Sequence, residues 1–421
     1  MTGMSAPLTQ TWKRVAPRGA VFWLSILAIL AISLPNLLDP MVRYDDYPAL
    51  FAEPAGFWAK TLHEGRWLNY IWHLRGFETP AWLNYALYQA LWAIYAAALA
   101  SRVAGHMSLD KFTISLALVI MLSPSALLIS LWFNTLLPGL ALVALFAVIA
   151  CKTSEKTLLL LLPLFTVLTF MAYTTYPLLL LVVCLVHQKR RSILRLLALL
   201  AFFTASFILA ILVTYTLNWY VHGIFGVPLA EWREATPAQD WQGLLANAPK
   251  LVSTFSTFAR VTSFEFVPAI YFHLTLFVGA LAVMLRYATL EALYLFAGLV
   301  TGLTLMVAQI LKLGVEVPVR TFIFVWVFYG IVLLRAAQIA TQKNAFAGRM
   351  AYNAVFLIIA SYALQSFLQA GTYRAWQIET RLLVQQVPAT SKPVHFAGTP
   401  MKTRAAQDAG VQSDTGFEFR L

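Results

Sequence analysis

Long apolar runs separated by short polar segments dominate the chain from residue 20 to residue 368. A helix needs about 20 apolar residues to cross the hydrocarbon core of a bilayer, because each residue adds about 1.5 Å. The pattern therefore predicts eleven transmembrane helices. They cover residues 20–38, 81–101, 112–131, 136–151, 157–172, 177–187, 192–217, 266–285, 290–311, 319–339 and 351–368. The short pair 157–172 and 177–187 also fits a shallow hairpin.

Two polar segments, residues 39–80 and 218–265, are much longer than the others. Within the first, the stretch FWAKTLHEGRWLNYIWHLRG (57–76) repeats apolar residues at helical spacing, with tryptophans such as Trp58 and Trp72 among them. An amphipathic helix with tryptophan anchors is typical of the membrane interface. The sequence therefore predicts an all-α polytopic membrane protein with interfacial helices in both long external loops.

The composition excludes a soluble globular protein. Of the 421 residues, 60% are hydrophobic and only 11% are charged, whereas soluble domains carry about 25% charged residues. The net charge of +12 does not indicate nucleic-acid binding, because most basic residues stand where a bilayer would place them. Cys151 and Cys184 lie in or beside apolar segments, so we expect neither a disulfide framework nor a catalytic thiol.

The distribution of charge predicts the orientation. With the N-terminus inside, the cytoplasmic segments carry fifteen Lys or Arg residues and three acidic residues, and the external segments before residue 369 carry nine and eleven. Cytoplasmic loops are enriched in Lys and Arg, so the N-terminus is expected in the cytoplasm. We divide the chain into a cytoplasmic N-terminus (1–19), a transmembrane unit (20–368) and an external, largely polar tail (369–421). The tail beyond residue 386 is expected to be poorly ordered.

Two adjacent aspartates, Asp45 and Asp46, follow the first predicted span in the sequence MVRYDDYPAL. Most carboxylates directly after a membrane-spanning helix are simply exposed to solvent where the helix leaves the membrane. Here Tyr44 and Tyr47 flank the pair, and the polar cluster HEGRW (63–67) can fold back over it. Adjacent residues point in different directions on any regular backbone, so the two carboxylates are expected to have different tasks. Desolvation at an apolar boundary raises the pKa of a carboxyl group, as a general base near neutral pH requires.

A basic pair flanks the external loop in KLGVEVPVRTF (312–322). Arg320 stands at the outer end of a predicted span, where an arginine can simply extend its side chain to the interface. Together with Lys312 it could instead hold a phosphate, because the guanidinium group matches a phosphate through two parallel hydrogen bonds. Both interpretations remain open from the sequence.

Amide and aromatic side chains gather in two short external turns, SPSALLISLWFNTLLPG (123–139) and AYTTYP (172–177). Asn134, Tyr173 and Tyr176 are expected near the outer surface. Interfacial tyrosines often serve only as membrane anchors. A sugar site uses the same residue types, since aromatic faces stack on sugar rings and amides bind hydroxyl groups.

Several motifs of other functional classes are absent. The predicted spans hold no chain of ionisable residues of the kind that proton-coupled transporters need, because His273 and Glu291 stand alone. The sequence contains no P-loop, no HExxH, no GxSxG and no zinc-ligand spacing. It also has no soluble nucleotide-binding domain, so a nucleotide-linked donor is not expected.

The chain has an acidic pair directly after its first span, then a GRWL stretch and many further spans. In this order it resembles the membrane glycosyltransferases of the GT-C fold, and more narrowly the GtrII-type family, which modifies O-antigen and similar surface glycans. The resemblance rests on the motifs RYDDYPAL, EGRWLNY (64–70), LSPSALLISLWFNTLLP (122–138), FMAYTTYPLLLL (170–181) and VPVRTF (317–322). Each motif is short, and their order along residues 20 to 340 carries more weight than any one of them.

The resemblance implies a polyprenyl-phosphate-linked sugar donor and a lipid-linked or surface glycan acceptor, at the periplasmic face of the bacterial inner membrane. It implies Asp45 as the general base, Asp46 as its partner, and inversion at the anomeric carbon. Residues assigned to the donor phosphate are Arg320, Lys312 and Arg66. Residues assigned to the acceptor or the sugar are Tyr44, Tyr47, Trp67, Asn134, Tyr173 and Tyr176. The chain departs from the family pattern at Asn134, where an acidic residue is often found.

No cofactor is expected, and a divalent metal is not favoured, because two carboxylates without a third acidic ligand make a weak site. Two other functions fit the pattern. An O-antigen polymerase or ligase type of enzyme would depend on the external arginines more than on the aspartates. A lipid or polysaccharide transporter (flippase) would move its substrate and form no covalent bond. The sequence does not identify the sugar, the accepting hydroxyl group or the oligomeric state.

Overall fold

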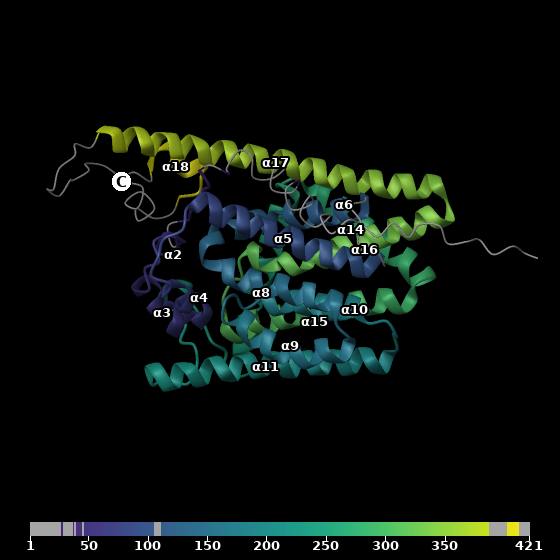
Figure 1. Ribbon diagram of the computed structural model, residues 1–421, viewed down its shortest axis with the longest axis horizontal. Coiled ribbons are helices and arrows are strands. Elements are labelled where there is room, and N and C mark those ends of the chain that lie inside the picture. Colours follow the sequence, from purple (N-terminus) through teal and green to yellow (C-terminus); the bar gives the residue numbers. More distant parts are fainter. Residues whose placement is uncertain are drawn as a thin grey trace, which may run out of the picture.

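The computed structural model describes residues 27, 37, 39–43, 46–104, 111–386 and 402–411, and every regular element in them is a helix. Figure 1 shows these helices running side by side, with α17 along one edge and α11 along the other. The α-helices and short 3₁₀ helices (η) are α2 (Tyr47–Leu50), α3 (Ala55–Glu64), α4 (Trp67–His73), α5 (Ala81–Ala104), α6 (Lys111–Met121), α7 (Pro124–Ile129), η2 (Ser130–Trp132), α8 (Phe133–Lys152), α9 (Glu155–Phe170), α10 (Tyr176–His187), α11 (Ile193–His222), η3 (Glu231–Arg233), α12 (Trp241–Ala246), α13 (Ala248–Ser263), α14 (Val267–Tyr287), α15 (Thr289–Leu313), η4 (Val319–Phe322), α16 (Ile323–Lys343), α17 (Ala345–Gln386) and α18 (Arg404–Asp408).

Six helical stretches of the described residues are long and apolar enough to cross a membrane. They are Pro124–Lys152, Ile193–His222, Val267–Tyr287, Thr289–Leu313, Val319–Lys343 and Ala345–Leu383. The prediction of an all-α, multi-pass membrane protein is therefore confirmed. The first predicted span, 20–38, lies outside the described residues except for residues 27 and 37. The number of eleven spans remains a prediction.

Serine residues set the starts of three helices. The side chain of Ser123 accepts a hydrogen bond from the backbone N–H of Ala126, and Ser154 and Ser192 do the same for the first turns of α9 and α11. Such caps satisfy N–H groups that have no partner within the helix. They divide the apolar sequence into separate helices. The break between α9 and α10, of 16 and 12 residues, has no such cap, and Pro177 stands in the first turn of α10.

The centre of the bundle is apolar and tightly packed. Every residue of α10 is buried, and most of α16 is buried as well. In contrast, α14 buries only Ala280 and Met284, although its sequence is equally apolar. An apolar helix that is exposed along most of its length is the arrangement expected where lipid surrounds a bundle.

The long helix α17 continues to Gln386, beyond the predicted end of the last span at residue 368. Its extension has a packing face, because Tyr373 and Trp376 are buried. The C-terminal segment 402–411 folds back against this extension, and the hydroxyl group of Thr403 donates to Glu379 Oε2 over 2.8 Å. Part of the tail that was expected to be poorly ordered is thus a helix-containing segment beside the end of the bundle where α2, α3 and α4 lie (Figure 1).

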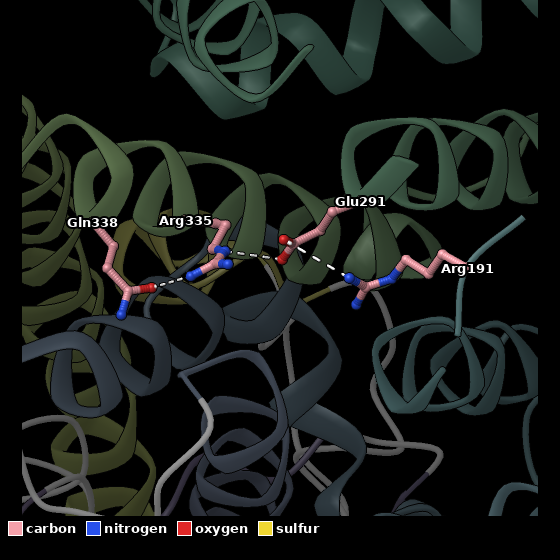
Figure 2. Close-up of polar contacts among 4 residues, drawn as sticks. All are labelled: Arg191, Glu291, Arg335 and Gln338. Atoms are coloured by element: carbon pink, nitrogen blue, oxygen red, sulfur yellow. Dashed lines mark hydrogen bonds and ion pairs between the residues drawn. The ribbon is translucent and has the colours of Figure 1, made fainter. Parts of the chain in front are cut away.

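A charged cluster ties three elements together at the end of α15 that is predicted to be cytoplasmic (Figure 2). Glu291 accepts from Arg335 Nε of α16 over 3.0 Å and lies 3.9 Å from Arg191 Nη1 in the connection from α10 to α11. Arg335 also donates to Gln338 Oε1 over 2.6 Å. The cluster joins α15 to α16 and to the connection from α10 to α11, so it is interpreted as a structural tie.

Glu291→Gln is expected to lower the free energy of unfolding by about 2 kcal/mol, because two partly buried guanidinium groups lose their shared carboxylate. Denaturation in detergent measures the change. The exposed Glu231 provides a matched control, and Glu231→Gln is expected to have no measurable effect. Equal stability of the Glu291 variant and the wild type would contradict the structural role.

Candidate functional site

A cavity of about 770 Å³ lies at the end of the bundle opposite the Glu291 cluster. Segments far apart in the sequence form its wall, including the α3–α4 connection, the start of α8 and the segment between α15 and η4. Its basic residues are Arg43, Arg66, Arg233, Lys250 and Arg320. Its acidic residues are Glu64, Glu234 and Glu316. The excess of basic side chains favours an anionic ligand.

Two of the arginines lie on one indole ring. The guanidinium carbon of Arg320 is 4.1 Å from the ring centroid of Trp132, and that of Arg43 is 5.5 Å from it. Stacking of this kind engages the face of a guanidinium group and leaves its N–H edges able to donate hydrogen bonds. Arg43 uses one of them, since its Nη1 donates to the carbonyl oxygen of Gly410 over 2.8 Å. Trp132 thus holds two cationic groups at the cavity wall.

A second pair of arginines shares one carboxylate. Arg66 Nε lies 2.7 Å from Glu64 Oε2, and Arg233 Nη2 lies 3.6 Å from Glu64 Oε1. Burial would raise the pKa of Glu64, but the nearby positive charges, above all Arg66, hold it below its usual value. Glu64 is therefore ionised at neutral pH. One carboxylate between two arginines leaves this side of the cavity with net positive charge.

Lys250 reaches the cavity from α13 and binds backbone oxygen atoms. Its Nζ donates to the carbonyl oxygen of Glu234 over 3.0 Å and also to that of Gly314. Lys250 therefore joins the loop before α12 to the end of α15. We interpret it as a residue that shapes the cavity.

Asp46 lies in the protein interior at the start of α8. Its side chain is buried, and its Oδ2 accepts from both the backbone and the side-chain nitrogen of Asn134, each over 3.0 Å. Its Oδ1 accepts from the backbone N–H of Thr135 over 2.7 Å. The first N–H groups of a helix lack partners within the helix and carry partial positive charge, so they suit a carboxylate. Asp46 thus fastens the segment after the first predicted span to α8.

Asp46→Ala is expected to lower the free energy of unfolding by about 3 kcal/mol, because three hydrogen bonds to a charged acceptor are lost inside the protein. The exposed Glu53 serves as the control, and Glu53→Ala is expected to leave stability unchanged. Thermal denaturation of the purified variants in detergent measures both. An Asp46→Ala variant as stable as the wild type would show that the network contributes little.

Asp45 and Tyr44 lie outside the described residues. In the sequence they stand between Arg43, which lines the cavity, and the buried Asp46. Of this segment, the structure places Arg43 in the cavity wall and Asp46 at the start of α8.

The remaining polar and basic candidates divide between the cavity and its surroundings. Arg66, Arg320 and Tyr173 line the cavity, and the guanidinium carbon of Arg66 lies 5.7 Å from the ring centroid of Tyr173. Lys312 does not line the cavity. Its Nζ instead donates to the carbonyl oxygen of Ala238 over 2.5 Å. Asn134 is buried and accepts from Asn84 Nδ2 over 2.8 Å while it binds Asp46.

Three further aromatic candidates are buried inside the protein. Tyr47 is buried in the core, and Tyr176 is buried edge-to-face against Tyr173 at 5.3 Å between ring centroids. Trp67 is also buried, and its indole N–H donates to Asn218 Oδ1 over 2.8 Å. None of these three residues lines the cavity, and Tyr176 contacts it only through Tyr173.

The sequence did not identify several residues of the cavity. Arg43 and Glu64 stand beside or within motifs that were singled out, so their neighbours were a usable signal. Arg233 lies in a loop without a recognisable pattern, and Trp132 stands between two predicted spans, within the turn 123–139, where only its amide and tyrosine neighbours were considered. Only the folded chain brings these residues to one cavity.

The chemistry of the lining suits an anion better than a metal ion. Among the described residues, no group of three or more His, Cys, Asp or Glu side chains is placed to hold a metal. Glu64 is engaged by two arginines. A phosphate group carries the charge and the hydrogen-bond acceptors that guanidinium groups match.

Comparisons with known proteins find no match, since no family model, no curated protein and no solved structure matches the chain. The resemblance to the GtrII-type family therefore rests on the sequence motifs. The function is argued below from the cavity and from its position in the bundle.

Proposed function

We propose that the protein is a membrane glycosyltransferase of the GT-C type that uses a polyprenyl-phosphate-linked sugar as donor. The acceptor would be a lipid-linked or surface glycan on the periplasmic face of a bacterial inner membrane. The observation that supports the proposal is the arginine-lined cavity, whose wall includes Arg43 of the segment that bears Asp45 and Asp46. Apolar helices adjoin this end of the bundle and would receive the polyprenyl chain.

In the proposed reaction, the oxygen of an acceptor hydroxyl group attacks the anomeric carbon of the donor sugar. The new carbon–oxygen bond forms as the bond between that carbon and the phosphate oxygen breaks, and the phosphate leaves with the bonding electron pair. The hydroxyl proton passes to a carboxylate. Because attack and departure occur on opposite sides, the anomeric configuration is inverted.

The leaving polyprenyl phosphate gains a second negative charge during this step. Fixed positive charges around it therefore stabilise the transition state more than the ground state. Arg320 and Arg66 are proposed to bind the phosphate, together with Arg43 and Arg233, which were not identified from the sequence. Lys312 would act from outside the lining by holding the loop at Ala238.

The two aspartates take different roles in this proposal. Asp45 would accept the proton of the acceptor hydroxyl group as the general base. Asp46 would position Asp45, because its own carboxylate is bound to the start of α8 by three hydrogen bonds. Eleven spans and a cytoplasmic N-terminus would place this site outside the cytoplasm.

The test uses purified protein in lipid vesicles with labelled polyprenyl-phosphate sugars and a lipid-linked glycan acceptor, with and without EDTA. The expected result is a labelled product from one donor, formed equally in the presence of EDTA. Movement of labelled lipid across the bilayer without any new product would favour a transporter. Loss of activity in EDTA would assign a metal to the reaction.

A polymerase or ligase type of enzyme is the second candidate, because the same cluster of arginines fits the diphosphate of a lipid-linked glycan. The two enzymes differ in their dependence on Asp45. Asp45→Asn is expected to be nearly harmless in a polymerase of this kind and severe in the proposed glycosyltransferase.

A further inference from the structure

A second, smaller cavity of about 220 Å³ lies between η2, the end of α13 and the extension of α17. Its size is below the range of about 300–1,000 Å³ that is usual for sites that enclose a whole drug-sized ligand. It therefore suits one part of a larger molecule. None of the predicted site residues that the structure describes lines it.

The two cavities are neighbours because three segments contribute to both. Met41 lines the small cavity and Arg43 the large one. In η2, Leu131 lines the small cavity and Trp132 lines the large one. A backbone hydrogen bond of 3.2 Å from the N–H of Arg43 to the carbonyl oxygen of Leu131 joins these two segments into one partition.

Helix α13 supplies the third shared wall. Arg260 lines the small cavity, and Thr257, one turn earlier, lines the large one. Arg260 Nη2 lies 3.4 Å from the hydroxyl oxygen of Thr257. Ligands in the two cavities would thus be separated by little more than one layer of side chains, next to the chain segment that continues into Asp45.

The lining of the small cavity differs from that of the large one. Arg260 and Glu265 carry opposite charges, so the cavity has no excess of positive charge. Helix α17 presents Gln365, Ser366 and Gln369 to it, and amide and hydroxyl groups of this kind bind neutral hydroxyl groups. The polar part of the lining therefore favours a neutral, hydroxyl-rich group.

Large exposed apolar side chains adjoin this lining on both sides. Leu364, Phe367 and Leu368 alternate with the polar residues of α17 and are 58%, 65% and 53% exposed. Phe266 and Val267, which follow Glu265, are 63% and 56% exposed. These residues belong to candidate membrane spans or stand next to one, so the cavity adjoins a surface suited to lipid.

The turn that closes the small cavity has an unusual backbone. Phe264 and Glu265 both have positive φ, 52° and 64°. Residues other than glycine rarely adopt this conformation, and two in succession are rarer still. The turn places Glu265 in the cavity lining directly before the exposed apolar pair.

We propose that the small cavity binds the neutral, hydroxyl-bearing headgroup of a lipid-linked glycan, with the lipid chain lying against the apolar surface of α17 and α14. The inference rests on the proposed function, for which this cavity would hold the acceptor. The shared partition would present an acceptor hydroxyl group next to the donor in the arginine-lined cavity. Gln365 and Gln369 would bind the headgroup.

The test is photolabelling of the full-length protein in phosphatidylcholine vesicles with a farnesyl glucoside that carries a diazirine in its farnesyl chain. Because the lipid chain is proposed to lie on these two helices, peptide mapping is expected to find saturable labelling of the start of α14 and of α17 around residues 364–373. Gln365→Leu and Gln369→Leu are each expected to weaken binding about fivefold, the equivalent of one net hydrogen bond. Gln385→Leu on the same helix changes a residue outside the cavity and is the matched control.

Two competitors define the ligand class. Unlabelled farnesyl glucoside is expected to abolish labelling, and free glucose at the same concentration is expected to have no effect because it lacks the lipid chain. Farnesyl phosphate is expected to compete only at about tenfold higher concentration, because the lining has no excess positive charge. Equal competition by farnesyl phosphate or by glucose would overturn the proposal, and so would unchanged labelling in both glutamine variants.

The outcome does not depend on turnover. Labelling of the small cavity in a protein that consumes no sugar donor would reject the proposed glycosyltransferase and keep the glycolipid site. Donor consumption without specific labelling would support the glycosyltransferase and reject the glycolipid site. Thermal denaturation shows whether each glutamine variant is folded. If only one of the two variants folds, its labelling alone decides the test.

Discussion

Replacing Asp45 with asparagine is expected to lower the rate of sugar transfer about 10³-fold, within the range of about 10² to 10⁴ for the loss of a general base. Asparagine keeps the size of the side chain but does not accept the acceptor proton. The measurement is the single-turnover rate of transfer from a labelled donor in vesicles. Thermal denaturation is expected to show a folded variant, because the buried anchor of this segment is Asp46.

Asp46→Asn is the companion variant for this prediction, because Asp46 is proposed to position Asp45. The asparagine amide group would point a donor at the N–H groups of α8, so the expected loss is in stability. Transfer activity close to that of the wild type in Asp45→Asn would reject Asp45 as the base. A severe loss of transfer in a stable Asp46→Asn variant would support the role of Asp46 in positioning the base through its bonds to α8.

Replacing Arg320 with alanine is expected to lower kcat/KM for the donor by about 10² to 10³, as for the removal of one donor group that stabilises developing negative charge. Arg320 lies on the ring of Trp132 and lines the cavity. Arg320→Lys is expected to restore little activity, because an ammonium group has neither the planar face nor the paired N–H edges of a guanidinium group. Steady-state kinetics over a range of donor concentrations measures both variants.

Lys312→Met removes a positive charge from the last turn of α15 without changing the cavity lining. Its effect on kcat/KM is expected to be less than about tenfold, because the charge acts through solvent and through a loop contact. A loss as large as that of Arg320→Ala would place Lys312 in the phosphate site. Full activity of Arg320→Ala would remove Arg320 from it.

Apolar periodicity was sufficient to predict the helices and the membrane class. Spans are set by local sequence, since every backbone polar group in a bilayer must be satisfied within its own helix. The ends of α8, α11 and α15 lie within a few residues of the predicted spans for the same reason. The extension of α17 to Gln386 was missed, because the burial of Tyr373 and Trp376 depends on neighbours distant in sequence.

The candidate site was predictable only in part. Arg66, Arg320 and Tyr173 stood in recognisable motifs and line the cavity. Arg233 forms an ion pair with Glu64, which stands far before it in the sequence. Arg43 donates a hydrogen bond to Gly410, 367 positions away in the sequence. No local pattern encodes such contacts. The burial of Asp46 is a similar case, since its partners at the start of α8 are 88 and 89 positions away.

The most direct test of the central claim is nuclear magnetic resonance of the product that the wild type forms from a labelled polyprenyl-phosphate sugar and a lipid-linked glycan. Direct displacement of polyprenyl phosphate predicts a new glycosidic bond whose anomeric configuration is opposite to that of the donor. An intact donor after prolonged incubation, or a product that retains the donor configuration, would contradict it.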